Sequence, residues 1–275
     1  MTVVVGFVGP HGAVMAADGE ATERDSSSSH QVDDKIWTDK RLLFGYTSNT
    51  AVRDPLRESI RQGLKSFDPG QDRYTVGASL CSWMRRVLDP AYANYVPSNA
   101  PIQVKLNELG GTLLTIGCDS GGHWLLDINS HCTMTPHWDR GFHTVGSGSH
   151  GAEVIKALLE HHDLPRLDPW KLKLMAFRSV AACIKVGGPL GVGGAVHLWS
   201  ATVGEDFQEA RGSEMKGLQR NVEEWEQSES ELFNSMRQEG ADPLPEGAPA
   251  TPDSSEPEPP SGRSRALGRR ELLGP

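Results

Sequence analysis

The first eighteen residues constrain the fold of this chain more than any other stretch. Val3–Val8 is an apolar run of strand length, Gly9–Gly12 has the composition of a turn, and Ala13–Ala17 is a second apolar run that ends at Asp18. Two such runs joined by a glycine- and proline-containing turn predict a β-hairpin, and their continuous apolar character predicts buried strands. The rest of the chain must therefore supply the layers that cover this hairpin.

Thr2 stands directly ahead of the hairpin and offers an unusual chemistry. Removal of Met1 would free the α-amine of Thr2, so that one residue would carry both a hydroxyl nucleophile and a base. The α-amine has a pKa of about 7.7–8.0 in model compounds, much closer to neutrality than that of a lysine. The alternative is an ordinary residue at the start of an edge hairpin, and the remainder of the chain has to decide between the two.

The totals exclude several classes of protein. A net charge of −9 over 275 residues and a pI of about 5.6 argue against a nucleic acid or an anionic membrane surface as the main partner. No window approaches the ~18 apolar residues of a membrane span, and no signal peptide is evident, so we expect a cytoplasmic protein. The four cysteines and ten histidines show no spacing typical of metal ligands, so we expect no metal, no cofactor and no disulfide.

The order of the remaining segments predicts the fold class. Strands are followed by two helices, further strands, two more helices and a last strand, which favours two sheets packed face to face with a helical layer outside each. This is an α+β, four-layer αββα sandwich. The expected strands are 32–37, 41–46, 112–118, 123–128, 142–145 and 194–200; the expected helices are 54–67, 75–88, 151–161 and 169–185; the segments 19–31 and 91–110 are expected to be irregular.

The boundaries of the two long helices before residue 90 rest on particular residues. Asp54 and Pro55 predict the start of the first, and Pro90 predicts the end of the second. From residue 212 the composition changes, because apolar residues recur three and four positions apart among many Glu and Gln. We expect a folded domain over 1–211, an amphipathic helix over 212–238 and a disordered tail, rich in Pro, Glu, Ser and Gly, over 239–275.

An N-terminal threonine nucleophile needs a charge that tunes it, a donor for the oxyanion and a support for its amine. Lys35 beside the carboxylate of Asp18 can supply the charge, the backbone N–H of Gly45 the oxyanion donor, and Ser147 in a Gly-Ser-Gly-Ser turn the support for the amine. Each residue also has an ordinary structural interpretation: an exposed lysine, a turn cap, a strand bulge and a loop connection.

Together these residues resemble a known family. The GAVMAAD segment ending at Asp18, DDKIW with Lys35, FGYTS with Gly45 and GSGSHGAEVI with Ser147 follow Thr2 in the order and approximate spacing of proteasome β subunits. The aspartate-glycine pair after the second strand is also similar to the simpler bacterial two-ring peptidase of the same superfamily. The resemblance covers about residues 2–200 and implies an N-terminal-nucleophile hydrolase fold, in which these five residues cleave peptide bonds as a threonine endopeptidase.

The resemblance also implies how such a peptidase would assemble and select substrates. It implies homo-oligomeric rings that enclose the nucleophiles, peptides or unfolded proteins as substrates, and an AAA+ ATPase unfoldase as a partner. The implied apolar pocket beside the nucleophile is lined by Ala21, Trp37, Leu43 and Thr47.

The chain departs from the family in one segment. An aspartate and a serine after the second long helix help to organise the N-terminus of proteasome β subunits, and Gly187 and Leu190 occupy the corresponding positions here. Two alternatives to a peptidase therefore stay open: a catalytically silent scaffold subunit, and a non-proteolytic amidase on the same fold.

Overall fold

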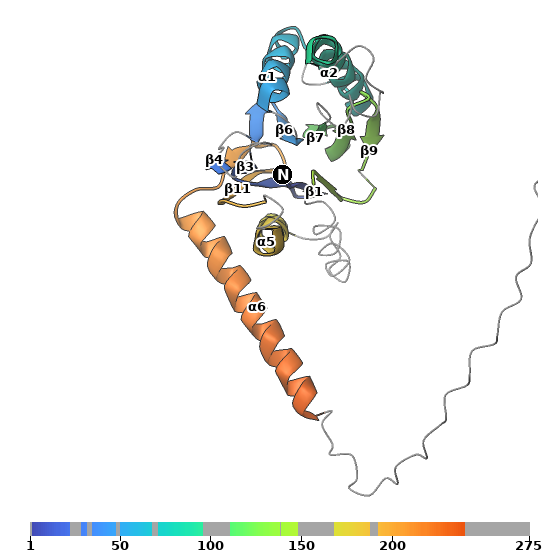
Figure 1. The fold of residues 1–275 in the computed structure, drawn as a ribbon. Helices are drawn as coiled ribbons and strands as arrows, with labels where there is room; N and C mark the ends of the chain where they lie inside the picture. The colour runs from blue at the N-terminus through green and yellow to red at the C-terminus, as the bar shows by residue number, and fades with distance from the viewer. Residues whose placement is uncertain are drawn as a thin grey trace, which may run out of the picture. The chain divides into compact units, whose positions relative to one another are not determined.

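Two five-stranded antiparallel sheets form the centre of the protein in a computed structural model (Figure 1). The structure describes residues 2–22, 29–31, 35–47, 50–67, 71–95, 111–137, 139–147, 168–187 and 192–239. The helix expected over 151–161 lies outside these residues.

The N-terminal hairpin lies at the centre of the first sheet, as predicted. The strand order is β10-β1-β2-β11-β12, and β1 pairs with β2 from Val4↔Ala17 to Gly9↔Gly12. Every residue of β2 is buried, because β1 and β11 flank it and both of its faces are covered. The strands are β1 (Val4–Gly9), β2 (Gly12–Asp18), β10 (Phe142–Val145), β11 (Val196–Thr202) and β12 (Gln208–Glu209).

The second sheet is a meander in which each strand pairs with the next along the chain. Its strands are β5 (Ile36–Asp39), β6 (Leu42–Thr47), β7 (Thr112–Asp119), β8 (Gly122–Ile128) and β9 (Met134–Pro136). A separate pair of strands, β3 (Glu20–Thr22) and β4 (Ser29–Gln31), lies within the segment 19–31, which was expected to be irregular. That prediction was wrong because strands of three residues are too short to show a hydrophobic period.

Three apolar clusters hold these elements together. One lies between the sheets and joins side chains of β1 and β2, such as Val4 and Met15, to side chains of β6, β7 and β8, such as Leu43 and Leu125. Another joins the opposite face of the first sheet to α5 (Pro169–Gly187), whose Leu172 is fully buried. Because successive strand residues point to opposite faces, β1 and β2 contribute alternate residues to the two clusters.

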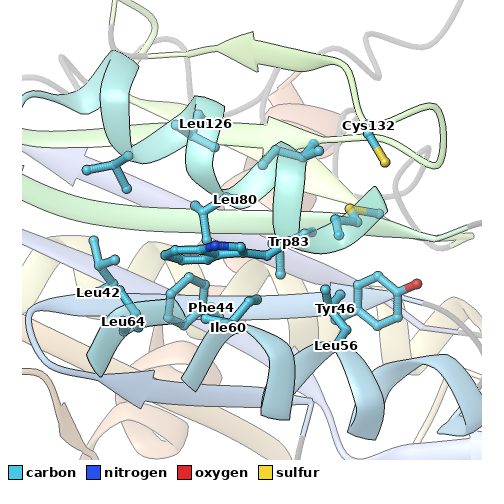
Figure 2. Close-up of a cluster of buried hydrophobic side chains, with 14 of the residues drawn as sticks. Leu42, Phe44, Tyr46, Leu56, Ile60, Leu64, Leu80, Trp83, Leu126 and Cys132 are labelled. Atoms are coloured by element: carbon cyan, nitrogen blue, oxygen red, sulfur yellow. The ribbon is translucent and has the colours of Figure 1, made fainter. Parts of the chain in front are cut away.

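The third cluster joins the second sheet to α1 (Thr50–Lys65) and α2 (Arg73–Tyr95), which lie side by side (Figure 1). Figure 2 shows how side chains from β6, α1 and α2 meet around the indole of Trp83. The labelled members are Leu42, Phe44, Tyr46, Leu56, Ile60, Leu64, Leu80, Trp83, Leu126 and Cys132.

Both helix boundaries that were predicted from prolines are wrong. Helix α1 begins at Thr50 and contains Pro55, so Asp54 is not its N-cap. Helix α2 begins after Asp72, which accepts hydrogen bonds from the backbone N–H groups of Tyr74 and Thr75, and it continues through Pro90. Pro90 is exposed, so water can hydrate the carbonyl group that loses its helical donor there.

The last described helix, α6 (Ser213–Glu239), matches the amphipathic pattern. Leu218 and Val222 are buried in the cluster that contains α5, and an ion pair of 2.6 Å joins Lys173 of α5 to Glu214.

The compact unit that contains both sheets ends at Ser228, within α6, and residues 229–275 form a second unit. The domain division at 211 stays a prediction, and residues 240–275 of the predicted tail lie outside the described residues. Among the described helices none has the length and apolar character to cross a membrane.

Candidate active site

Thr2 lies where the chain enters the first sheet, partly exposed and next to Ser147. Its backbone N–H donates a hydrogen bond of 3.0 Å to Ser147 Oγ. The contact joins residues far apart in the chain because β1 pairs with β10, with Val4 opposite Val145, and Ser147 lies in the turn that follows β10. The nitrogen that would become the free amine therefore already has a hydroxyl partner.

Gly146 allows this close approach. Its φ is +103°, a backbone conformation that glycine adopts readily and other residues rarely adopt. A Cβ at this position would lie 2.1 Å from the carbonyl oxygen of Thr2. The same Cβ would lie 3.2 Å from Cγ2 of Thr47, at the end of β6. Thr2 ahead of β1, Gly146 after β10 and Thr47 at the end of β6 therefore lie close together.

The carboxylate of Asp18 is the polar centre beneath Thr2. Asp18 is fully buried at the end of β2, and its Oδ1 accepts a hydrogen bond of 2.8 Å from the backbone N–H of Val3. The backbone N–H of Asp18 in turn donates to the carbonyl of Val3 at 3.3 Å. Because Val3 is bonded to Thr2, this reciprocal pair fixes the position of the threonine backbone.

Lys35 extends from the second sheet to the same carboxylate. Its Nζ lies 2.9 Å from Asp18 Oδ1, and both residues are buried. The backbone of Lys35 is held by β6, since the N–H of Tyr46 donates to its carbonyl at 3.1 Å. A buried ion pair of this kind balances its own charge, and its carboxylate also binds the residue that follows Thr2.

The glycine-rich segment after α5 contributes a contact that the sequence did not predict. The backbone N–H of Gly193 donates to Asp18 Oδ2 at 3.4 Å, in the connection that leads into β11. Leu190 lies outside the described residues. The glycine composition of the segment was the available signal, because glycine permits close approach of a backbone to a buried group.

Cys183 of α5 lies close enough to Asp18 for an electrostatic interaction between the two side chains. Burial, together with the negative charge of Asp18, raises the pKa of Cys183 to about 11. The thiol is therefore neutral near physiological pH, and since the thiolate is the reactive form, Cys183 is not a candidate nucleophile.

Gly45 does not occupy the place that its predicted role requires. It lies inside β6, opposite Ile36 of β5 and Leu114 of β7, where backbone N–H groups take part in the sheet ladder. The space beside it is filled by Val4 and Met15, since a Cβ at position 45 would lie 2.6 Å from Val4 Cγ1. The absence of a side chain at Gly45 thus serves the packing of the two sheets.

The predicted pocket residues are divided by the structure. Trp37 is buried against Phe44 in the cluster under α1 and α2, and Leu43 is fully buried between the sheets, so neither side chain is available to a substrate. Thr47 lies beside Gly146, and its hydroxyl bonds the backbone of Thr112. Ala21 belongs to β3, and its side chain lies outside the part of the chain that the structure describes.

The protein thus consists of two antiparallel sheets covered by helices, and a buried pair of Asp18 and Lys35 lies next to the backbone of its first threonine. Among solved structures, the fold is similar to an Anbu (Gly-1) mutant from Hyphomicrobium sp. strain MC1 and to Anbu, an ancestral beta-subunit, from Yersinia bercovieri. Both superpose on this chain with a TM-score of 0.64 and 14% sequence identity. The alignment with the Hyphomicrobium protein covers 85% of this chain and 97% of that protein, and the alignment with the Yersinia protein covers 84% and 96%. The likeness shows that this chain shares the fold of these two proteins. No family model and no curated protein matches the sequence.

Proposed function

We propose that this chain is a threonine-type endopeptidase of the N-terminal-nucleophile hydrolase class, and that its sheets and helices form the four-layer αββα sandwich of that class. One observation carries the proposal: a fully buried carboxylate, Asp18, binds both Lys35 and the residue next to Thr2, while Thr2 itself is partly exposed and its nitrogen contacts Ser147. A structural hairpin has no need of such a pair beneath its first residue.

The reaction begins once the bond between Met1 and Thr2 is cleaved. The Thr2 hydroxyl oxygen attacks the peptide carbonyl, and its proton passes to the Thr2 α-amine. The amine then gives this proton to the departing nitrogen of the substrate, the C–N bond breaks, and an ester remains on Thr2. A water molecule, deprotonated by the same amine, hydrolyses the ester and restores the hydroxyl.

The surrounding residues have distinct parts in this proposal. The Lys35 ammonium favours the ionised form of the hydroxyl, Asp18 holds the ammonium and the backbone of Val3, and Ser147 orients the amine. Because Gly45 is inside the sheet ladder, we place the oxyanion donor at the C-terminal end of β6, where the side chain of Thr47 lies beside Gly146.

The wider setting follows the same proposal. We propose that copies of the chain form rings in the cytoplasm, that the substrates are peptides or unfolded proteins, and that an AAA+ ATPase unfoldase delivers the latter. The support is the likeness of the fold to Anbu of Yersinia bercovieri, an ancestral beta-subunit. Of the predicted pocket residues, we place Thr47 beside the nucleophile, because its side chain and the carbonyl oxygen of Thr2 both lie next to Gly146.

Three measurements on the purified protein test the activity. Intact mass and N-terminal sequencing should show Thr2 as the first residue, fluorogenic peptides should be cleaved, and a peptide vinyl sulfone should add its mass to the fragment that contains Thr2. Thr2→Ala should abolish cleavage, while Thr2→Ser, which keeps a hydroxyl and an amine, should retain it. Retention of Met1 on all of the protein, or full cleavage by Thr2→Ala, would refute the mechanism.

The absence of an aspartate and a serine from 186–194 favours the alternative of a silent scaffold subunit. Such a subunit would assemble into rings, yet it would neither cleave peptides nor form the adduct on Thr2. An amidase would form the adduct with small electrophiles, leave peptides intact and turn over a small amide.

A further inference from the structure

We propose that Asp127, His137 and His143 form a binding site for a divalent cation of the zinc type, independent of the proposed peptidase site. Asp127 is on β8, His137 directly follows β9, and His143 is on β10. Strands β8 and β9 belong to the second sheet and β10 to the first, so a cation held by the three side chains would join the two sheets.

The three side chains already approach the geometry of a ligand set. Nε2 of His137 lies 2.5 Å from Asp127 Oδ1, Nε2 of His143 lies 3.6 Å from the same oxygen, and one ligand atom from each residue lies within 4.8 Å of the others. Zinc binds histidine nitrogen and carboxylate oxygen at about 2.0–2.2 Å, which in a tetrahedral site separates neighbouring ligand atoms by about 3.3 Å. The observed separations lie within roughly 1.5 Å of that value, so small shifts of side chains suffice.

The surroundings favour a cation over a purely protein cluster. The imidazole rings of His137 and His143 are stacked, with centroids 3.6 Å apart and planes inclined by 9°, and Asp127 and His137 are each 8% exposed. The stacking places the Nε2 atoms of both rings within 3.6 Å of the same carboxylate oxygen of Asp127, so that the three ligand atoms converge on one point between the sheets. Two histidines and one carboxylate are ligands that suit zinc and leave a fourth position for water.

Backbone hydrogen bonds hold the connection from β9 to β10 in place. The N–H of His137 donates to the carbonyl of Leu125 on β8 at 2.9 Å, and the N–H of Gly141 donates to the carbonyl of His137 at 3.2 Å. The carbonyl of Gly141 accepts from Val8 of β1 at 2.8 Å. The connection is thus anchored to both sheets, which places the ligands without help from the metal and lowers the entropy cost of binding it.

The sequence predicted no metal site because these three residues lack the short spacing of familiar zinc motifs. They are separated by nine and five residues and come from three strands or their ends. A weaker signal was present: Asp127 is an acidic residue within the apolar run Leu125–Ile128, and buried carboxylates are paired or bind metals.

Zinc titration of the full-length protein, stripped with a chelator and exchanged into metal-free buffer, tests the site. Calorimetry should show one zinc ion bound per chain, zinc should raise the melting temperature, and cobalt(II) should give the visible absorption bands of a nitrogen- and oxygen-ligated site. His143→Gln and Asp127→Asn should each weaken binding more than the ~10–100-fold that loss of an outer-shell partner causes. These readouts do not involve peptide cleavage, so they stand or fall separately from the proposed peptidase activity.

The matched control is His131→Gln, an exposed histidine in the turn between β8 and β9, which should bind zinc as the unaltered protein does. Circular dichroism identifies any variant that fails to fold, and the unaltered protein alone decides the main question. If the folded, metal-free protein shows no saturable zinc binding, the three residues are a hydrogen-bonded cluster only and the proposal is overturned. Unchanged affinity in a folded His143→Gln variant would overturn it as well.

Discussion

Substitution of Asp18 by asparagine should strongly destabilise the protein, although the two side chains have nearly the same shape. The carboxylate is fully buried and accepts three hydrogen bonds, from Val3, Lys35 and Gly193. An asparagine has one acceptor oxygen, so its NH₂ group must face at least one of these donors. The ammonium of Lys35, itself only 5% exposed, would lose the charge that compensates it.

The magnitude follows from the burial of both partners. Removal of one member of a buried ion pair costs about 3–5 kcal/mol of unfolding free energy. Lys35→Met should cost less, about 1–3 kcal/mol, because Asp18 keeps the N–H groups of Val3 and Gly193. The double variant removes both charges, so it should be more stable than the sum of the two single effects predicts. It should nevertheless lack the proposed peptidase activity, since the lysine charge that the mechanism uses is gone.

Urea unfolding followed by tryptophan fluorescence measures these effects. Protein concentration must be the same for all variants, because assembly into oligomers would add concentration-dependent stability. The slope of free energy against urea should be unchanged, so that midpoints report stability. A loss below about 1 kcal/mol in Asp18→Asn, well short of the cost of breaking a buried pair, or strict additivity in the double variant, would refute the view that this ion pair holds the site.

Three further changes test the neighbouring residues. Gly146→Ala should destabilise by at least about 1–3 kcal/mol in urea unfolding, because its φ is +103° and its Cβ would collide with Thr2; normal stability would contradict the described turn. Ser147→Ala removes one hydrogen bond and should lower kcat/KM for a fluorogenic peptide by about tenfold while leaving the melting temperature nearly unchanged; unaltered turnover would exclude a role for Ser147. Cys183 has an ordinary pKa of 9.0 that rises to about 11 on folding, so between these values the unfolded chain binds fewer protons and stability falls as pH rises. Cys183→Ala should therefore lose less stability than the unaltered protein between pH 9 and 11, and parallel pH profiles would contradict the raised pKa.

The strands and their order could be predicted largely from the sequence because buried strands leave continuous apolar runs. The N-terminal hairpin, the pair β7 and β8, and helix α5 appear close to their predicted positions. Helix ends could not be predicted from prolines, because the effect of Pro55 and Pro90 depends on whether the lost hydrogen bond faces water. The three-residue strands β3 and β4 are too short for any periodicity.

The residues of the candidate site were predictable where a polar side chain interrupts an apolar pattern. Asp18, which follows the apolar run 13–17, is of this kind. Lys35 follows two aspartates and was predicted from its place directly ahead of a strand, and the structure brings the two side chains together. The interpretation of Gly45 needed the pairing of β6 on both of its edges, which no local pattern contains. The contribution of Gly193 comes from its backbone, so the identity of its side chain could indicate only that a close approach was possible.

The burial of β2 on both faces has a consequence for how the chain finds its native pairing. A strand with one apolar and one polar face is held in register by that difference, but β2 is apolar on both faces, and a slip of one residue along β1 or β11 would still bury apolar side chains. Asp18 removes this ambiguity, because only one register brings its carboxylate to Lys35 and to the N–H of Val3. The ion pair between Asp18 and Lys35 thus specifies the register of β2 in addition to stabilising the folded state.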